Sequence, residues 1–89
     1  MPFFLYILHS QKIDRYYIGV SADVESRLQA HNSASKGWTT RGRPWHLVFK
    51  RQFAEKMTAQ KWERWLKNQK SRKLLLEVID NKFDWETHG

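Results

Sequence analysis

Five residues between positions 6 and 63 have side chains suited to phosphate chemistry: Tyr6, Tyr17, Arg27, His31 and Glu63. A phenol beside positive charge can exchange a proton, because that charge lowers its pKa. Arginine can bind a phosphate through two parallel hydrogen bonds, and histidine can hydrogen bond to an attacking or departing oxygen. The tyrosines also have an ordinary explanation, since tyrosines in strands are usually core residues.

The position of Glu63 is the hardest to explain by structure alone. The spacing of Ala59, Trp62 and Leu66 predicts the apolar stripe of a helix, and Glu63 projects within about 40° of Ala59. A carboxylate there loses hydration unless it finds cations or donors. Lys67, four residues later, offers a pair worth about 0.2–0.5 kcal/mol. A divalent cation such as Mg²⁺ would also explain the position, and the spacing does not decide between the two.

Arg27 and His31 lie one helical turn apart, in a helix predicted to follow "YYIG". Val24 and Leu28 mark its apolar stripe. At about 100° per residue, His31 lies beside Val24, and Arg27 lies further along the same flank. These two residues form either a solvated helix edge or part of a phosphate site. The other histidines show no HxH or HExxH spacing, so we expect no zinc site.

The tyrosines belong to a predicted hairpin. If its loop contains residues 10–13, Tyr6 lies opposite Tyr17, and both phenols share one face of the sheet. Gly19, just after Tyr17, permits either close backbone approach or a bend.

Aromatic and β-branched residues at 3–10 predict a strand, "RYYIGV" at 15–20 a second and the alternation at 45–53 a third, and capping residues with helical spacing predict three helices. In the third strand Trp45, Leu47, Phe49 and Phe53 alternate with polar residues for most of its length. In order, the elements are strands 3–10 and 15–20, a helix from an N-cap at Ser21 to about Asn32, strand 45–53, a helix capped by Thr58 and a helix from Ser71 to Ile79. We therefore expect an α+β protein with a small three-stranded antiparallel sheet flanked by helices. Residues 1–80 would form a single domain and residues 81–89 a C-terminal tail.

Positive charge is concentrated in one half of the chain, whose net charge is +7. Residues 36–73 hold twelve basic and two acidic residues, as expected for a protein that binds a polyanion, most often nucleic acid. A merely soluble basic surface is the alternative. The residues expected to contact nucleic acid are Lys36, Arg41, Arg43 and Lys67.

The chain contains no cysteine, so disulfide partners and thiolate metal sites are excluded. The apolar run at residues 3–8 is too short to span a membrane and has no basic segment before it. We therefore expect a cytoplasmic protein without membrane partners, and a monomer by default.

The same residues resemble the motifs of the GIY-YIG nuclease family. "LYI" at 5–7 and "YIG" at 17–19, with Arg27, His31 and Glu63, are in the family's order. The segments "RLQAHN", "GRPWHLVF" and "AQKWERWLK" are similar to its small single-domain members, often called putative endonucleases. The resemblance extends from about Phe3 to Ile79.

The resemblance implies a metal-dependent phosphodiesterase built on a three-stranded sheet. Tyr6 and Tyr17 would line the site, one of them as general base for water. Arg27 would stabilise the charge of the scissile phosphate, and His31 would assist proton transfer or phosphate binding. Glu63 would hold a single Mg²⁺ or Mn²⁺.

The first functional hypothesis is therefore a DNA endonuclease or structure-sensing nuclease of low sequence specificity, acting in DNA repair or recombination. DNA is expected over RNA. The alternative is a noncatalytic basic module that binds nucleic acid on the same fold. A third hypothesis is an interaction domain that docks a partner through exposed tryptophans, such as Trp38 and Trp65.

Overall fold

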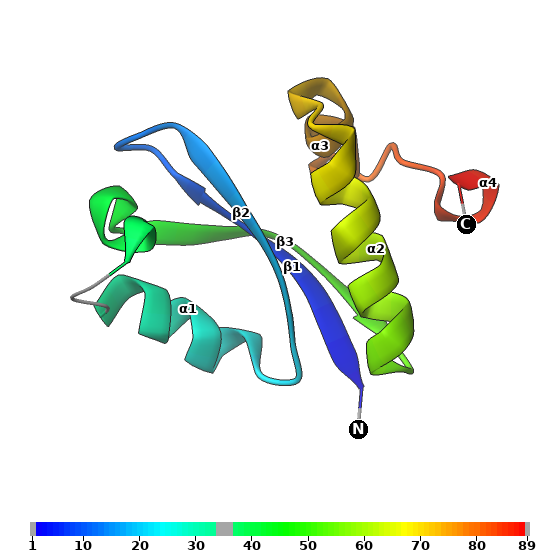
Figure 1. Cartoon of the computed structure of the whole chain (residues 1–89), viewed down its shortest axis with the longest axis horizontal. Helices are drawn as coiled ribbons and strands as arrows, with labels where there is room; N and C mark the ends of the chain where they lie inside the picture. The colour runs from blue at the N-terminus through cyan, green and yellow to red at the C-terminus, as the bar shows by residue number, and fades with distance from the viewer. Residues whose placement is uncertain (1, 34–36, 89) are drawn as a thin grey trace.

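The computed structural model describes residues 2–33 and 37–88 (Figure 1). In chain order the elements are β1 (Phe3–Ser10), β2 (Arg15–Ser21), α1 (Val24–Ser33), the 3₁₀ helix η1 (Trp38–Gly42), β3 (Trp45–Phe53), α2 (Lys56–Gln69), α3 (Arg72–Ile79) and α4 (Trp85–His88). Within these residues, every helix is too short or too polar to cross a membrane.

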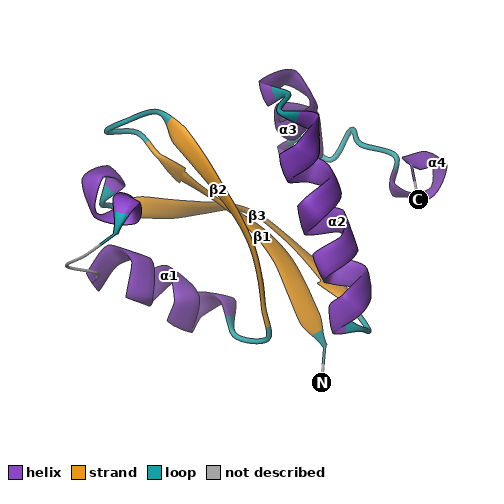
Figure 2. Ribbon diagram, viewed as in Figure 1, coloured by secondary structure: helices purple, strands orange, loops and turns teal. Residues whose placement is uncertain are grey.

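The three strands form one antiparallel sheet in the order β2-β1-β3. Figure 2 shows α1 on one side of this sheet and α2 with α3 on the other. The central strand β1 therefore has both faces covered. All eight of its residues are at least partly buried, and Leu5 to Leu8 are fully buried. The expected α+β class, a three-stranded antiparallel sheet flanked by helices, is confirmed.

The register of the β1–β2 hairpin differs by two residues from the expected one. Tyr6 pairs with Gly19, and Tyr17 pairs with Leu8. The loop ends one residue later than expected, because its last residue, Asp14, adopts a left-handed backbone conformation with φ of 50°. Since a shift of two residues leaves every side chain on its own face of the sheet, Tyr6 and Tyr17 still project from the same face.

Strand β3 contains a β-bulge that changes which face its side chains occupy. Consecutive residues of β1 pair with Leu47 and Phe49, so Val48 is an extra residue between the two pairs. The extra residue reverses the alternation. Trp45 consequently packs on the α1 side of the sheet, and Phe49 and Phe53 pack on the α2 side.

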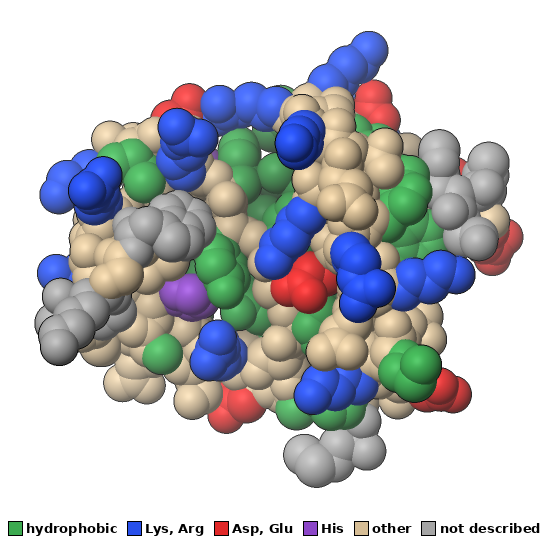
Figure 3. Space-filling view, in the orientation of Figure 1, with side chains coloured by type: hydrophobic (Ala, Val, Ile, Leu, Met, Phe, Trp, Pro, Cys, Tyr) green, Lys and Arg blue, Asp and Glu red, His purple; other side chains and the backbone are tan. Residues whose placement is uncertain are grey.

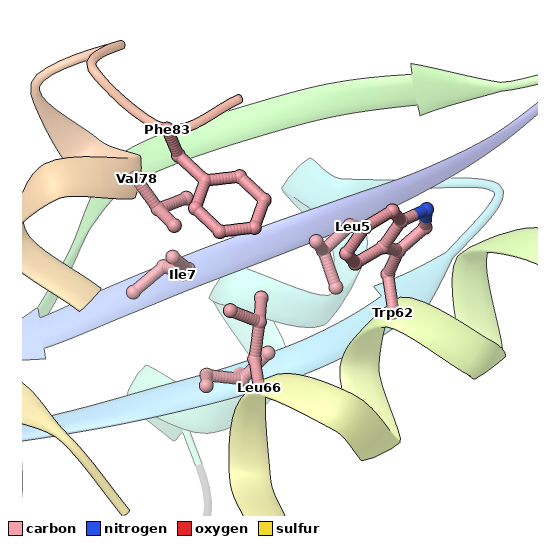
Figure 4. Close-up of a cluster of buried hydrophobic side chains, with 7 residues drawn as sticks. Leu5, Ile7, Trp62, Leu66, Val78 and Phe83 are labelled. Carbon is pink, nitrogen blue, oxygen red and sulfur yellow. The ribbon is translucent and has the colours of Figure 1, made fainter. Parts of the chain in front are cut away.

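The larger core cluster lies between the sheet and helices α2 and α3 (Figure 4). Its buried members are Leu5, Ile7, Ile18, Trp62, Leu66, Val78 and Phe83. Phe83 comes from the segment expected to be a tail, and Trp85 stacks on Phe49 with ring centroids 6.0 Å apart. Trp65, expected to be exposed for docking, is half-buried, with ring centroids 5.6 Å from Trp62 and 5.7 Å from Phe83. The side chain of Trp38 lies outside the described part of the chain.

Two of the three expected helix starts differ from the structure. Asp23, rather than Ser21, accepts a hydrogen bond from the first turn of α1, at 3.1 Å. Helix α2 begins at Lys56, two residues before Thr58. The expected cap of α3 is confirmed, because the hydroxyl of Ser71 accepts a backbone hydrogen bond from the first turn at 3.2 Å.

Candidate active site

The five residues singled out for phosphate chemistry meet at the β2 edge of the sheet. In Figure 1, β2 crosses in front of the other strands, with α1 on one side of it and α2 on the other. Figure 3 shows a histidine and an acidic side chain on this face, with Lys and Arg side chains around them. Both helices contact β2, so side chains from opposite faces of the sheet meet around its edge.

The two phenols lie side by side. Tyr6 is 1% exposed, Tyr17 is half-buried, and their ring centroids are 6.3 Å apart. The Tyr6 ring packs directly on Gly19, where an added Cβ would lie 2.5 Å from both Cζ and Oη of the tyrosine. Of the two explanations left open for Gly19, the structure therefore supports close approach: only a residue without a side chain leaves room for the phenol.

Arg27 of α1 connects the two phenols by donating hydrogen bonds to Tyr6 and Tyr17. The bond to Tyr6 raises the pKa of Arg27, which keeps the guanidinium charged. The pKa of Tyr6 is also raised, because burial outweighs the opposing effect of Arg27. Positive charge therefore does lower the pKa of this phenol, as expected, but burial raises it by more. Its hydroxyl stays protonated at neutral pH and orients Arg27.

His31 lies behind Tyr17, with ring centroids 4.4 Å apart and an interplanar angle of 59°. The side chain is buried, and its Nε2 has no hydrogen-bond partner among the described residues. Burial, and then the charge of Arg27, lower the pKa of His31 below its usual 6.5. The imidazole is therefore neutral at pH 7 and supports the Tyr17 ring from the α1 side.

Because this pKa is lowered, we expect His31 to destabilise the protein in mild acid. Above the unfolded pKa of about 6.5, both states hold a neutral ring and His31 adds no pH dependence. As the pH falls through that value, the unfolded chain takes up the proton first, so the free energy of unfolding decreases. His31→Phe keeps an aromatic ring without a titrating group.

The measurement is urea unfolding at several values between about pH 8 and pH 5. The loss of stability in acid should be smaller in His31→Phe than in the parent protein. Gln52→Phe, at an exposed position of β3, adds an aromatic ring without removing a titrating group, so this control should keep the parent slope. Equal slopes in all three proteins would contradict the assignment.

The next residue, Asn32, was not singled out from the sequence, yet it fixes the end of α1. Its side-chain amide donates to the backbone carbonyl of Trp45 at 3.1 Å, and its Oδ1 accepts from the Trp45 N–H at 2.6 Å. These two bonds connect α1 to β3 one residue after His31. The only signal in the sequence was an amide residue at the end of a predicted helix, which has many other uses.

Glu63 reaches the cluster from α2. Its carboxylate accepts a hydrogen bond from Lys67 at 3.4 Å, and its charge contributes to the raised pKa of Tyr6. The Lys67 ammonium lies 5.9 Å from the centre of the Tyr17 ring. The Glu63 side chain is 24% exposed, so the lysine pair is present but does not seal the carboxylate from solvent.

The described residues offer a divalent cation one carboxylate rather than a complete set of ligands. Within residues 2–33 and 37–88 no three His, Asp or Glu side chains come together as a metal cage. Mg²⁺ is nevertheless often held by one or two carboxylates, with waters and substrate phosphates completing its shell. The partly exposed carboxylate of Glu63 suits such a site, in which the nucleic acid would supply further ligands.

The residues expected to contact nucleic acid are spread over the surface. Lys67 joins the cluster at the β2 edge. Arg43 donates to the backbone carbonyl of Asn32 at 3.5 Å, at the C-terminal end of α1. Arg41 is exposed on η1 and lines a hollow together with Ile13, Arg15 and Tyr16 of the β1–β2 hairpin. Lys36 lies outside the described residues.

Most of the chain is similar to known proteins. The family model of the GIY-YIG catalytic domain matches residues 2–75. Among solved structures, the solution NMR structure of a UPF0213 protein from Bacillus halodurans is similar, with 32% sequence identity and a TM-score of 0.58. The match covers 92% of this chain and 86% of that one. No match was found among curated proteins.

Proposed function

Because this chain belongs to the GIY-YIG family of nucleases, we propose that it is an endonuclease that hydrolyses phosphodiester bonds of DNA with a single Mg²⁺ or Mn²⁺. The observation that carries the proposal is the meeting of Tyr6, Tyr17, Arg27, His31 and Glu63 at one edge of the sheet. They come from two strands and two helices, and their shared contacts would let Tyr17, Arg27 and Glu63 face one phosphate, with Tyr6 and His31 packed behind them.

Arg27 has the properties needed to bind the scissile phosphate. It is exposed, it remains charged, and its hydrogen bonds with Tyr6 and Tyr17 limit the directions in which the guanidinium can point. A cation held in place before the reaction stabilises the charge that develops on the phosphate oxygens without reorganising. Tyr6 would act in this step as a positioning residue for Arg27.

Tyr17 is the better placed of the two phenols to remove a proton from the attacking water. It is half-buried rather than fully buried, and it lies between the Arg27 guanidinium and the Lys67 ammonium. His31, packed against the ring, would hold Tyr17 in this orientation.

Glu63 would hold the divalent cation, which supplies charge neutralisation at the phosphate and helps to orient water. The ammonium of Lys67 would then have to share the carboxylate or turn away. Its side chain is 53% exposed, so it is free to turn toward solvent or toward a substrate phosphate.

The proposal predicts cleavage that depends on the metal. Purified protein incubated with plasmid, branched, double-stranded and single-stranded DNA should cut at least one of them in Mg²⁺ or Mn²⁺, and EDTA should stop the reaction. RNA of the same sequence shows whether cleavage depends on the deoxyribose of DNA, and it should be cut more slowly. Products are resolved on denaturing gels, which separate internal cuts from the removal of single terminal nucleotides.

A noncatalytic nucleic-acid-binding module is the second candidate, because Glu63 is already paired with a lysine. Binding that weakens with salt, without cleavage in either metal, would favour this candidate over the nuclease. It would leave the fold and the family unchanged.

A further inference from the structure

A groove of about 540 Å³ lies beside the candidate active site, between the β1–β2 hairpin and the junction of α2 with α3. Its floor is apolar and its rim is polar. Figure 3 shows a hollow on this face with hydrophobic side chains inside and Lys and Arg side chains at its margin. The lining residues used below are Arg15, Tyr16, Ile18, Lys67, Lys70 and Arg72, with Asp14 at one end.

The rim of the groove is strongly basic. Four of its residues are cations and one is an anion, Asp14. Asp14 already accepts hydrogen bonds from Arg72 and from His9. Arg15 and Lys70 are exposed and have no acidic partner among the described residues. Two unpaired cations on opposite walls of one groove favour an anion between them.

One wall of the groove is formed by flat side chains. Tyr16 is half-buried, with the His9 ring centroid 4.5 Å from its own, and the Arg72 guanidinium lies 5.2 Å from the centre of the Tyr16 ring. Ile18 extends the apolar surface toward the floor. Aromatic and guanidinium planes with further cations along a groove are the combination by which proteins bind single-stranded nucleic acid, with bases against the planes and phosphates against the cations.

Lys67 joins the groove to the candidate active site. It lines the groove, while its ammonium lies 3.4 Å from the Glu63 carboxylate and 5.9 Å from the Tyr17 ring centre. A strand whose phosphate sits at Tyr17 and Arg27 would therefore enter the groove within a short distance along its backbone.

We propose that this groove binds a single-stranded segment of the nucleic-acid substrate, next to the phosphate that is cleaved. The position of the cleaved phosphate rests on the proposed function, whereas binding in the groove does not. The preferred substrate would then carry an unpaired segment beside the cleavage point, as in a flap, fork or overhang.

The test uses the double variant Arg15→Gln, Lys70→Gln and a matched control, Lys61→Gln, Arg64→Gln. The control removes the same charge from exposed residues of α2 that do not line the groove. Fluorescence anisotropy in EDTA gives the affinity for single-stranded and double-stranded DNA of equal length, without cleavage. Salt is varied between about 50 and 200 mM.

The groove variant should bind single-stranded DNA at least about tenfold more weakly than the control variant, and its log-log salt slope should be smaller by about 1.4, or 0.7 for each lost phosphate contact. Its affinity for duplex should fall no more than that of the control. Equal losses in both variants, or equal losses for single and double strands, would overturn the proposal. The two proposals fail separately, because binding is measured in EDTA: a groove effect without cleavage in Mg²⁺ contradicts the nuclease alone.

Discussion

Glu63→Gln should reduce the rate of DNA cleavage by about 10³-fold while leaving the protein folded. The amide has the shape of the carboxylate but carries no charge, so a metal ion held by this side chain would lose its anionic protein ligand. Glu63 is partly exposed and its contact with Lys67 is long, so the lost pair should change the free energy of unfolding by less than about 1 kcal/mol. Single-turnover cleavage in Mg²⁺, together with urea unfolding, separates the two effects.

Glu25→Gln is the matched control for this change. Glu25 is exposed in the first turn of α1, and its substitution removes the same charge from a residue that does not act on the pKa of Tyr6. Its cleavage rate should equal that of the parent protein. DNA binding in EDTA should not weaken in Glu63→Gln, because a negative charge has been removed. Undiminished cleavage by Glu63→Gln would end the proposed mechanism.

Gly19→Ala should lower both stability and cleavage. The new methyl group would lie 2.5 Å from Cζ and Oη of Tyr6, a contact that the buried ring can relieve only by moving. Such overpacking costs about 1–3 kcal/mol of the free energy of unfolding. Because Tyr6 orients Arg27, a displacement of about 1 Å should also slow cleavage by about 10²-fold.

Gly42→Ala distinguishes these two effects. There the added Cβ would lie 2.6 Å from the Trp45 ring, so the packing penalty is similar, but the clash involves no residue of the candidate active site. At a temperature where both variants are folded, only Gly19→Ala should cleave slowly. Equal cleavage by the two variants would show that Tyr6 does not position Arg27.

The sequence predicts much of the fold because most of its signals are local. The aromatic and β-branched residues of 3–10 and the alternation in 45–53 predict two strands whose bounds are confirmed, and Ser71 caps α3 as expected. The register of the hairpin depends on the left-handed conformation of Asp14, which an aspartate adopts only in some loops. The bulge at Val48 has no local signal, because it depends on how β3 pairs with β1.

The candidate site follows from the sequence only in part. The order of the motifs identified the five residues. It left open whether Glu63 pairs with Lys67 or binds a cation, and the structure shows the lysine pair and also places Glu63 near Tyr6. The raised pKa of Tyr6 depends on burial, which no spacing reveals. The groove was missed because Arg15 and Lys70 are distant in the chain and meet only when α2 packs beside β2.

The division of the five residues between the two sides of the sheet has a consequence for a chain that is still being synthesised. A ribosome that has released only the three strands and α1 has already delivered both phenols, Arg27 and His31. The acid arrives later, on α2. An incomplete product of translation would therefore carry most of the reaction centre and still be harmless to nucleic acid.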